Sequence, residues 1–120
     1  MQVLSNAFTF TAVPSAIVHA GGEPVYVDCE DNYILDLEDL ERKMQSSGAK
    51  WLIVSHMRGK VSDMDAITEM CKKHGVRFIE DCAHSLGVSV SVLDGRTAVY
   101  LSSVIVSPER GDNIRAEVLC

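Results

Sequence analysis

Two short apolar-rich runs most constrain the fold of this 120-residue chain. WLIVS at 51–55 and VRFIE at 76–80 have the length and β-branched content of strands, and WLIVS is apolar enough to be covered on both faces, as in a parallel sheet. Between the two runs, Met64, Ile67 and Cys71 recur at helical spacing. Because parallel strands need a crossover of this kind, the sequence predicts a strand–helix–strand unit.

The same alternation of elements extends towards the N-terminus. It predicts strands at 3–5 and 24–28, a helix within 9–20 whose regular part begins around Val13, and a helix at 36–47. Asp36 is placed to cap the second of these helices, and Ser62 to cap the helix that follows it, with Asp65 in the capping-box position. This order of elements predicts an α/β fold with three layers, in which helices flank a mainly parallel sheet.

The last third of the chain has a weaker pattern. Apolar residues alternate with serine at 88–92, Asp94–Gly95 is a hairpin-type turn signal, and 98–106 has the composition of another strand. The tail after residue 106 has no convincing period. The sequence therefore predicts a hairpin and a further strand here, and it predicts no helix or strand for the tail.

The overall composition favours one globular domain. The net charge is −6, and 47% of the residues are hydrophobic and 23% charged, with acids and bases interspersed. This balance gives no electrostatic reason to expect nucleic acid or an anionic membrane as a partner. No apolar run approaches the roughly 18 residues of a membrane helix, and the first residues lack a signal-peptide pattern, so we expect a cytoplasmic protein.

The spacing of the cysteines and glycines argues against several common metal, disulfide and nucleotide-binding motifs. Cys29, Cys71, Cys82 and Cys120 form no CxxC pair and have irregular spacing, which fits neither a zinc knuckle nor a disulfide scaffold. We expect reduced, structural thiols. The chain also has no GxGxxG turn after a strand and no P-loop, which argues against an unrelated nucleotide-binding α/β domain.

A cluster of titratable residues follows the second apolar run. Asp81, Cys82 and His84 stand where the predicted strand ends, within the stretch FIEDCAHSLG. Ser55–His56 and residues 6–10 occupy the same place after two other predicted strands. Since ligands bind beyond the carboxyl ends of parallel strands, these positions predict the floor of a pocket.

Each of these residues also has a simpler interpretation. An acid after a strand, such as Asp81, often caps the next helix, and a loop histidine such as His56 is more often packed than catalytic. Cys82 with His84 could form a thiolate pair, but residues two apart on a turn seldom face one another. A metal site from Asp81, Cys82, His84 and His56 has mixed ligands and no recognised spacing. The residue pattern alone leaves these alternatives open.

Four stretches of the chain together resemble one enzyme family. They are TFTAVPSAIVHAGGEPVYVD, NYILDLEDLERKM, IVSHMRGKVSDMDAI and KKHGVRFIEDCAHSLG. In this order and spacing, over about residues 4–87, they resemble the DegT/DnrJ/EryC1/StrS family of sugar aminotransferases, which are pyridoxal-phosphate (PLP) enzymes of fold type I. The resemblance implies that the chain is the central part of the large, cofactor-binding domain of such an enzyme.

The resemblance also implies a role for three residues. Asp81 matches the family's aspartate that pairs with the pyridine nitrogen of PLP, which keeps this nitrogen protonated so that the ring can accept electrons. His84 matches a position beside the cofactor ring that is usually glutamine or histidine. Phe10 matches the ring-stacking aromatic, although core packing is its simpler interpretation. His56 aligns with a loop histidine of the family, to which we assign no catalytic role.

The chain departs from the family's pattern after the matched segments. In the family, a lysine that forms a Schiff base with PLP follows a serine by several residues. Ser107 matches this serine approximately, but PERGD at 108–112 follows it, and the last lysine of the chain is Lys73. No histidine follows His84, which separates the chain from relatives that replace the lysine with histidine. The family's phosphate-binding turn lies upstream of the matched segments.

These matches and departures together predict a partial enzyme. We expect residues 1–120 to be part of a large domain, divergent or truncated over 88–120, without the small C-terminal domain. In the full-length family the substrates are a keto-sugar nucleotide and an amino-acid donor, and the active site lies at the interface of a homodimer. We expect that this chain alone cannot catalyse transamination. The alternatives are a catalytically dead PLP-binding or protein-interaction module, or an unrelated nucleotide-binding α/β domain.

Overall fold

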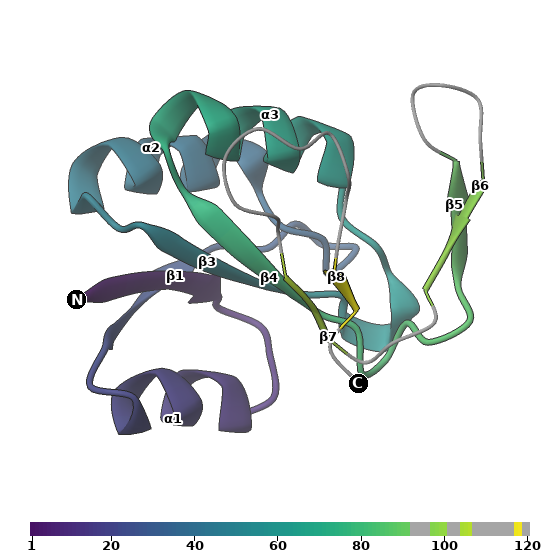
Figure 1. Cartoon of the computed structure of the whole chain (residues 1–120), viewed down its shortest axis with the longest axis horizontal. Coiled ribbons are helices and arrows are strands. Elements are labelled where there is room, and N and C mark those ends of the chain that lie inside the picture. The colour runs from purple at the N-terminus through teal and green to yellow at the C-terminus, as the bar shows by residue number, and fades with distance from the viewer. Residues whose placement is uncertain (92–96, 101–103, 107–116, 119–120) are drawn as a thin grey trace.

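The chain folds around a six-stranded sheet that is flanked by helices (Figure 1). The computed structural model describes residues 1–91, 97–100, 104–106 and 117–118. The strand order in the sheet is β2-β1-β3-β4-β7-β8. These strands are β1 Gln2–Asn6, β2 Glu23–Val27, β3 Trp51–Ser55, β4 Arg77–Asp81, β7 Val104–Val106 and β8 Glu117–Val118. Strands β1 to β4 pair in parallel, whereas β7 and β8 are antiparallel additions.

Helices lie on both faces of the sheet. Helix α1 Ala12–His19 lies on one face, and α2 Leu37–Ser47 and α3 Met64–His74 lie side by side on the other (Figure 1). A 3₁₀ turn, η1 Met57–Gly59, follows β3. This arrangement confirms the predicted α/β fold with three layers and a mainly parallel sheet. None of the helices in the described part of the chain is long and apolar enough to cross a membrane.

The main core lies between the sheet and the layer of α2 and α3. Its largest fully buried apolar side chains include Leu4, Leu35, Leu40, Leu52 and Ile67. Side chains alternate in direction along a strand, so Leu52 and Val54 enter this core while Trp51 and Ile53 point to the α1 face. On that face Trp51 and Ile53 are only half-buried, so WLIVS is covered less completely than its apolar composition predicts.

The thiols of Cys29, Cys71 and Cys82 are free. Cys71 belongs to the main core, which confirms its predicted position on the apolar face of α3. Burial there raises the pKa of its thiol to about 12. Because only the thiolate is reactive, this cysteine is held in an inert form.

Aspartates cap the two longer helices. The Asp36 carboxylate accepts hydrogen bonds from N–H groups in the first turn of α2, as predicted. The cap of α3 is Asp63, whose Oδ1 accepts from the Ala66 N–H at 3.1 Å. The prediction of Ser62 as this cap is wrong, and the capping box fails with it. Ser62 is buried and its hydroxyl accepts from the Leu35 N–H at 3.1 Å, so the loop before α2 uses the oxygen that the helix would need.

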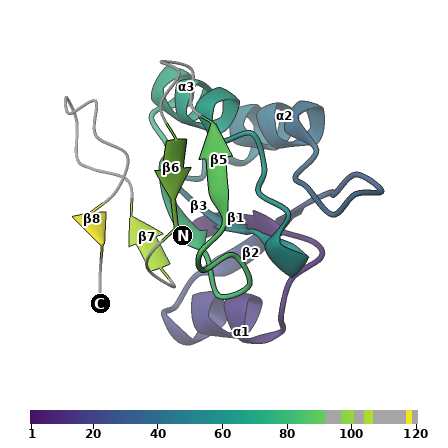
Figure 2. The ribbon, with the colours of Figure 1, turned by 90° about the vertical axis from the view of Figure 1, so that its right-hand side faces the viewer.

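The last third forms two separate antiparallel pairings. Strands β5 Ser89–Ser91 and β6 Thr97–Val99 form a hairpin beyond the carboxyl end of β4 (Figures 1 and 2). This confirms the predicted hairpin, although its turn at Asp94–Gly95 lies outside the described residues. The single strand predicted at 98–106 is wrong, because its start belongs to β6 and its end to β7. After β6, the Tyr100 N–H donates to the Val88 carbonyl at 3.0 Å, which continues the pairing of the hairpin by one residue.

Candidate functional site

The carboxyl ends of three parallel strands bring Asn6, Ser55 and Asp81 to one rim of the sheet. Ser55 and Asp81 are directly paired in the register of β3 and β4. The His56 N–H continues this pairing by donating to the Asp81 carbonyl at 3.1 Å. Asn6 is the last residue of β1, which lies beside β3. The structure thus places together the strand ends at which the sequence predicts the floor of a pocket.

The Asp81 side chain is half-buried and both of its carboxylate oxygens accept hydrogen bonds. Oδ2 accepts from the Ser55 hydroxyl at 3.0 Å, and Oδ1 accepts from the Ala83 N–H at 3.2 Å. Residues 83–87 form turns, and no helix follows β4 in the described part of the chain before β5. The interpretation of Asp81 as a helix cap is therefore wrong, because its carboxylate stabilises a turn.

A shallow hollow lies beside Asp81. Its lining residues are Ser55, His56, Met57, Asp81, Ala83 and His84. His84 is exposed, and its Nδ1 accepts a hydrogen bond from the Arg58 N–H at 3.2 Å. Arg58 has a positive φ of 56°, so the chain bends sharply at the point where it holds this imidazole. The structure therefore places Asp81 and His84 on the same hollow.

Phe10 lies on the surface rather than in the core. Its side chain is 69% exposed, so the alternative that Phe10 is a core residue is wrong. Phe10 does not line the hollow. Its neighbour Thr9 does reach the site, because the Thr9 Oγ1 lies 2.8 Å from the Ser55 Oγ. The loop that carries Phe10 is thus joined to the rim. Among the described residues, no interaction joins the Phe10 ring to Asp81.

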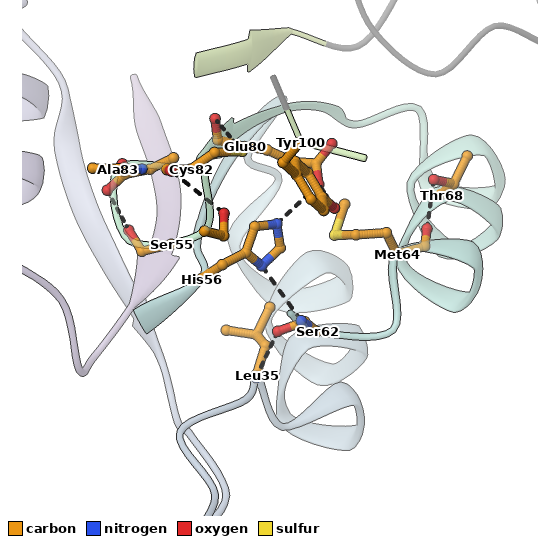
Figure 3. Close-up of polar contacts among 12 residues, drawn as sticks. Leu35, Ser55, His56, Ser62, Met64, Thr68, Glu80, Cys82, Ala83 and Tyr100 are labelled. Atoms are coloured by element: carbon orange, nitrogen blue, oxygen red, sulfur yellow. Dashed lines mark hydrogen bonds and ion pairs between the residues drawn. The ribbon is translucent and has the colours of Figure 1, made fainter. Parts of the chain in front are cut away.

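His56 belongs to a buried polar network behind the rim (Figure 3). Its Nε2 lies 2.9 Å from Glu80 Oε1, and the Tyr100 hydroxyl donates to the same oxygen at 2.7 Å. The Ser62 N–H donates to His56 Nδ1 at 3.4 Å, so the neutral ring carries its proton on Nε2 and donates to Glu80. With all of these side chains buried, His56 is a packed, hydrogen-bonded histidine that links β3 to β4.

The structure separates some of the residues that the thiol-pair and metal-site alternatives would bring together. Cys82 is buried, whereas His84 is exposed and bonded to Arg58, so the two side chains do not form a pair. His56, Glu80 and Cys82 offer possible metal-ligand atoms within 4.8 Å of one another. This set differs from the four residues that the sequence suggests. His56 and Glu80 already bond to each other, so the cluster acts as a hydrogen-bonded network in this structure.

Sequence reasoning missed Glu80 as a member of the buried network, and it placed Thr9 at the rim, within residues 6–10, without identifying its partner Ser55. A signal for Glu80 was present, because it follows the buried Phe78 by two residues and so points inward, where a carboxylate needs a partner. For Thr9, the sequence gives the position but no signal of the partner. Thr9 meets Ser55 across 46 residues of sequence, and only the pairing of strands brings the two hydroxyls together.

The chain is similar to known proteins in sequence. A model of the DegT/DnrJ/EryC1/StrS aminotransferase family matches residues 1–104. A UDP-N-acetyl-3-dehydro-alpha-D-glucosamine 3-aminotransferase from Acidithiobacillus ferrooxidans is 34% identical over 91 residues, which cover 75% of this chain and 24% of that protein.

Solved structures are similar over the same part of the chain. A DegT DnrJ EryC1 StrS aminotransferase from Brucella abortus has a TM-score of 0.69 and 30% identity, covering 72% of this chain and 25% of that one. NtdA from Bacillus subtilis, determined with bound cofactor PMP, has a TM-score of 0.67 and 29% identity, covering 72% of this chain and 20% of that one. The chain spans between a fifth and a quarter of the length of these relatives. It belongs to the DegT/DnrJ/EryC1/StrS aminotransferase family of PLP-dependent enzymes.

Proposed function

We propose that this chain is the PLP-facing part of a nucleotide-sugar aminotransferase, which transfers an amino group from an amino acid to a keto-sugar. The observation that carries this proposal is the Asp81 carboxylate, held by two hydrogen bonds at the carboxyl rim of a parallel sheet beside a hollow. Family membership and the sugar-nucleotide substrate in the name of the Acidithiobacillus relative support it.

The residues around Asp81 fit the ring-nitrogen end of PLP. An ionised carboxylate only accepts hydrogen bonds, and each Asp81 oxygen accepts one described bond from the protein, which leaves acceptor capacity on both. A protonated ring nitrogen is a positively charged donor, so it would form a charge-assisted hydrogen bond to this group. When bound, PLP supplies an electron sink for breaking bonds at the amino-bearing carbon of a substrate.

Two further residues take roles around the ring in this proposal. His84 lines the hollow with Asp81, and its bond to Arg58 holds the imidazole in place, so His84 would contact the cofactor ring. Phe10 has an exposed ring that is free to stack, and the adjacent Thr9 joins its loop to the rim. We assign no residue of the described part to the phosphate of PLP.

Amino transfer also needs a lysine amine. No lysine lines the hollow, and the segment around Ser107, which approximately matches the family's serine, lies outside the described residues. We propose that residues 1–120 bind PLP without a covalent bond. Transamination would then need a lysine supplied by further sequence or by another subunit.

The wider biological setting follows from the same proposal. The substrates would be a keto-sugar nucleotide and an amino-acid donor, and the complete enzyme would be a homodimer. The free thiols of Cys29, Cys71 and Cys82 suit a reducing compartment, which supports a cytoplasmic location. We propose neither nucleic acid nor a membrane as a partner, because the net charge of −6 offers no attraction to them.

A PLP titration tests the function. PLP binding to the 120-residue chain, followed by absorbance, should weaken about tenfold or more in Asp81→Asn, because an amide cannot form the charge-assisted bond. Asp65→Asn, on an acid of α3 outside the hollow, is the matched control and should bind as the wild type does. Equal binding by Asp81→Asn and the wild type would contradict the proposed role of the carboxylate.

Borohydride treatment of the PLP-loaded chain tests the missing lysine. Reduction followed by digestion should yield no pyridoxyl group specific to one lysine. A single modified lysine would contradict our proposal that binding is non-covalent. The alternative of a catalytically dead PLP-binding module predicts the same result, so the genomic sequence on both sides distinguishes the two. Family motifs in the same reading frame favour an enzyme, and their absence favours the module.

A further inference from the structure

A chain of hydroxyl groups links Asp81 to the loop that carries Phe10. Asp81 Oδ2 accepts from Ser55 Oγ at 3.0 Å, and Ser55 Oγ lies 2.8 Å from Thr9 Oγ1. A carboxylate oxygen only accepts, so the single hydroxyl proton of Ser55 points to Asp81. The Thr9 hydroxyl must therefore donate to Ser55, which fixes the direction of both hydrogen bonds.

Asn6 holds the middle of this hydroxyl chain in place. Its side-chain oxygen accepts from the Ser55 N–H at 2.9 Å, and its amide nitrogen donates to the Ser55 carbonyl at 3.2 Å. Asn6 is 0% and Ser55 1% exposed, so solvent does not compete for these bonds. The backbone of Ser55 is thus joined to β1 by the Asn6 side chain and to β4 by strand pairing, and its hydroxyl meets the carboxylate from a defined position.

We propose that Ser55 and Thr9 are positioning residues that orient the Asp81 carboxylate towards the ring nitrogen of PLP, an inference that rests on the proposed function. Ser55 binds Oδ2 and the Ala83 N–H binds Oδ1 at 3.2 Å, so both ends of the carboxylate are held. Thr9 extends the same bonded chain to the residue before Phe10. One set of hydrogen bonds therefore joins the counter-ion to the loop that carries the proposed stacking ring.

A positioning role differs measurably from a merely structural one. Loss of structure at the rim would weaken every ligand of the hollow to the same extent. Misorientation of Asp81 would weaken only ligands that donate a hydrogen bond from the ring nitrogen. The 1-deaza analogue of PLP has carbon in place of that nitrogen and keeps the same shape, so it separates the two roles.

The first experiment needs no ligand. Three-bond NMR couplings of the Asp81 β protons report its χ1 rotamer in the 120-residue chain. The wild type should show a single rotamer, and Ser55→Ala should show an average of several, because the bond to Oδ2 is lost. Ser46→Ala, on the exposed surface of α2, is the matched control and should leave these couplings unchanged.

The second experiment compares the two ligands. Ser55→Ala should raise the Kd for PLP about tenfold, and Thr9→Val about threefold, because Thr9 acts through Ser55. Thr9→Ser keeps the donor hydroxyl and should recover most of the affinity lost in Thr9→Val. The Kd for the deaza analogue should change less than about twofold in all of these variants, since it does not depend on Asp81.

The outcomes separate this inference from the proposed function. An unchanged Asp81 rotamer in Ser55→Ala overturns the positioning role, and so does equal weakening of PLP and its analogue. A wild type that binds neither ligand, or binds both equally, contradicts the proposed function instead, and the rotamer measurement still decides the positioning role. Should Ser55→Ala fail to fold, Thr9→Val, on a half-buried loop residue, takes its place in both measurements.

Discussion

Two adjacent carboxylates at the end of β4 lie in opposite surroundings. Glu80 points into the protein, where it is 0% exposed and its Oε1 binds both His56 and Tyr100. Asp81 points to the rim, where it is half-buried and lines a hollow with His84. Because successive side chains of a strand alternate in direction, a shift of one residue converts a structural acid into one that can meet a ligand.

The surroundings of the two acids decide which of them is available to bind a ligand. The two described donors to Glu80 Oε1, His56 and Tyr100, are buried side chains. The Glu80 carboxylate therefore has a structural role, because it links β4 to the loop after β3 and to Tyr100. The donors to Asp81 approach it from Ser55 and Ala83 and leave one side facing the hollow. An acid in a partly open site keeps the capacity to accept a further hydrogen bond, which a binding role requires.

The largest effect is expected from removing the buried acid. Glu80→Ala leaves the Tyr100 hydroxyl and the His56 Nε2–H without their buried acceptor, so the free energy of unfolding should fall by about 3 kcal/mol. Urea unfolding followed by circular dichroism measures this loss. A decrease below about 0.5 kcal/mol would show that the network contributes little and would remove the contrast with Asp81.

A third acid, Asp39 in the first turn of α2, extends the comparison to pH. Burial alone would raise the pKa of Asp39, but hydrogen bonds from Arg42, the Asp28 N–H and Lys43 outweigh burial and lower this pKa well below its usual range. A carboxyl whose folded pKa is lowered stabilises the fold above its unfolded pKa of about 4, and this stabilisation is lost as the pH falls.

Asp39→Asn should therefore cost about 1–2 kcal/mol at neutral pH. The free energy of unfolding of the wild type should fall between about pH 5 and pH 2, and the variant should show a smaller fall over this window. Urea unfolding at several pH values measures both curves. Asp31→Asn, on an exposed loop residue, serves as the control. Parallel curves for the wild type and Asp39→Asn would contradict this account.

The same contrast explains which features were predictable from the sequence. Asp81 was found because the end of a parallel strand is a general ligand position, and no distant residue had to be known. The roles of Glu80 and Ser62 were not predictable, because the side chain of each bonds to a partner far away in the sequence. Glu80 accepts a hydrogen bond from the Tyr100 hydroxyl, and Ser62 accepts one from the Leu35 N–H. The cap of α3 moved to Asp63 for this reason, since tertiary contacts override a local capping preference.

The prediction of a single strand at 98–106 was wrong for a related reason. Residues 98–106 have strand composition throughout, and composition says nothing about which neighbour a strand pairs with. The start of the segment pairs with β5 and its end with β4, and Tyr100 is the last described residue that bonds to the hairpin side. The Tyr100 bond to Glu80 ties this change to the buried network.

Tyr100→Phe is expected to have a smaller effect than Glu80→Ala. It removes one of the two donors to Glu80 Oε1 within the described residues but keeps the ring, so the free energy of unfolding should fall by about 1 kcal/mol. Tyr26→Phe is the matched control, because Tyr26 is 45% exposed and its hydroxyl can bond to water. Similar losses in both variants, measured by urea unfolding, would show that the Tyr100 hydroxyl has no special role.

The smallest effect on stability is expected at Asp81, where a variant separates the roles of the two acids most clearly. Asp81→Asn keeps an acceptor oxygen at a half-buried position, so the free energy of unfolding should change by less than about 1 kcal/mol while PLP affinity falls about tenfold. Glu80→Gln should show the reverse, with the larger loss of stability and nearly unchanged affinity for PLP. The pair is matched in chemistry and adjacent in sequence, so a crossed result cannot come from general damage to β4. If both variants lost stability and affinity in proportion, the two carboxylates would act as one structural unit, and the separation of roles along β4 would be wrong.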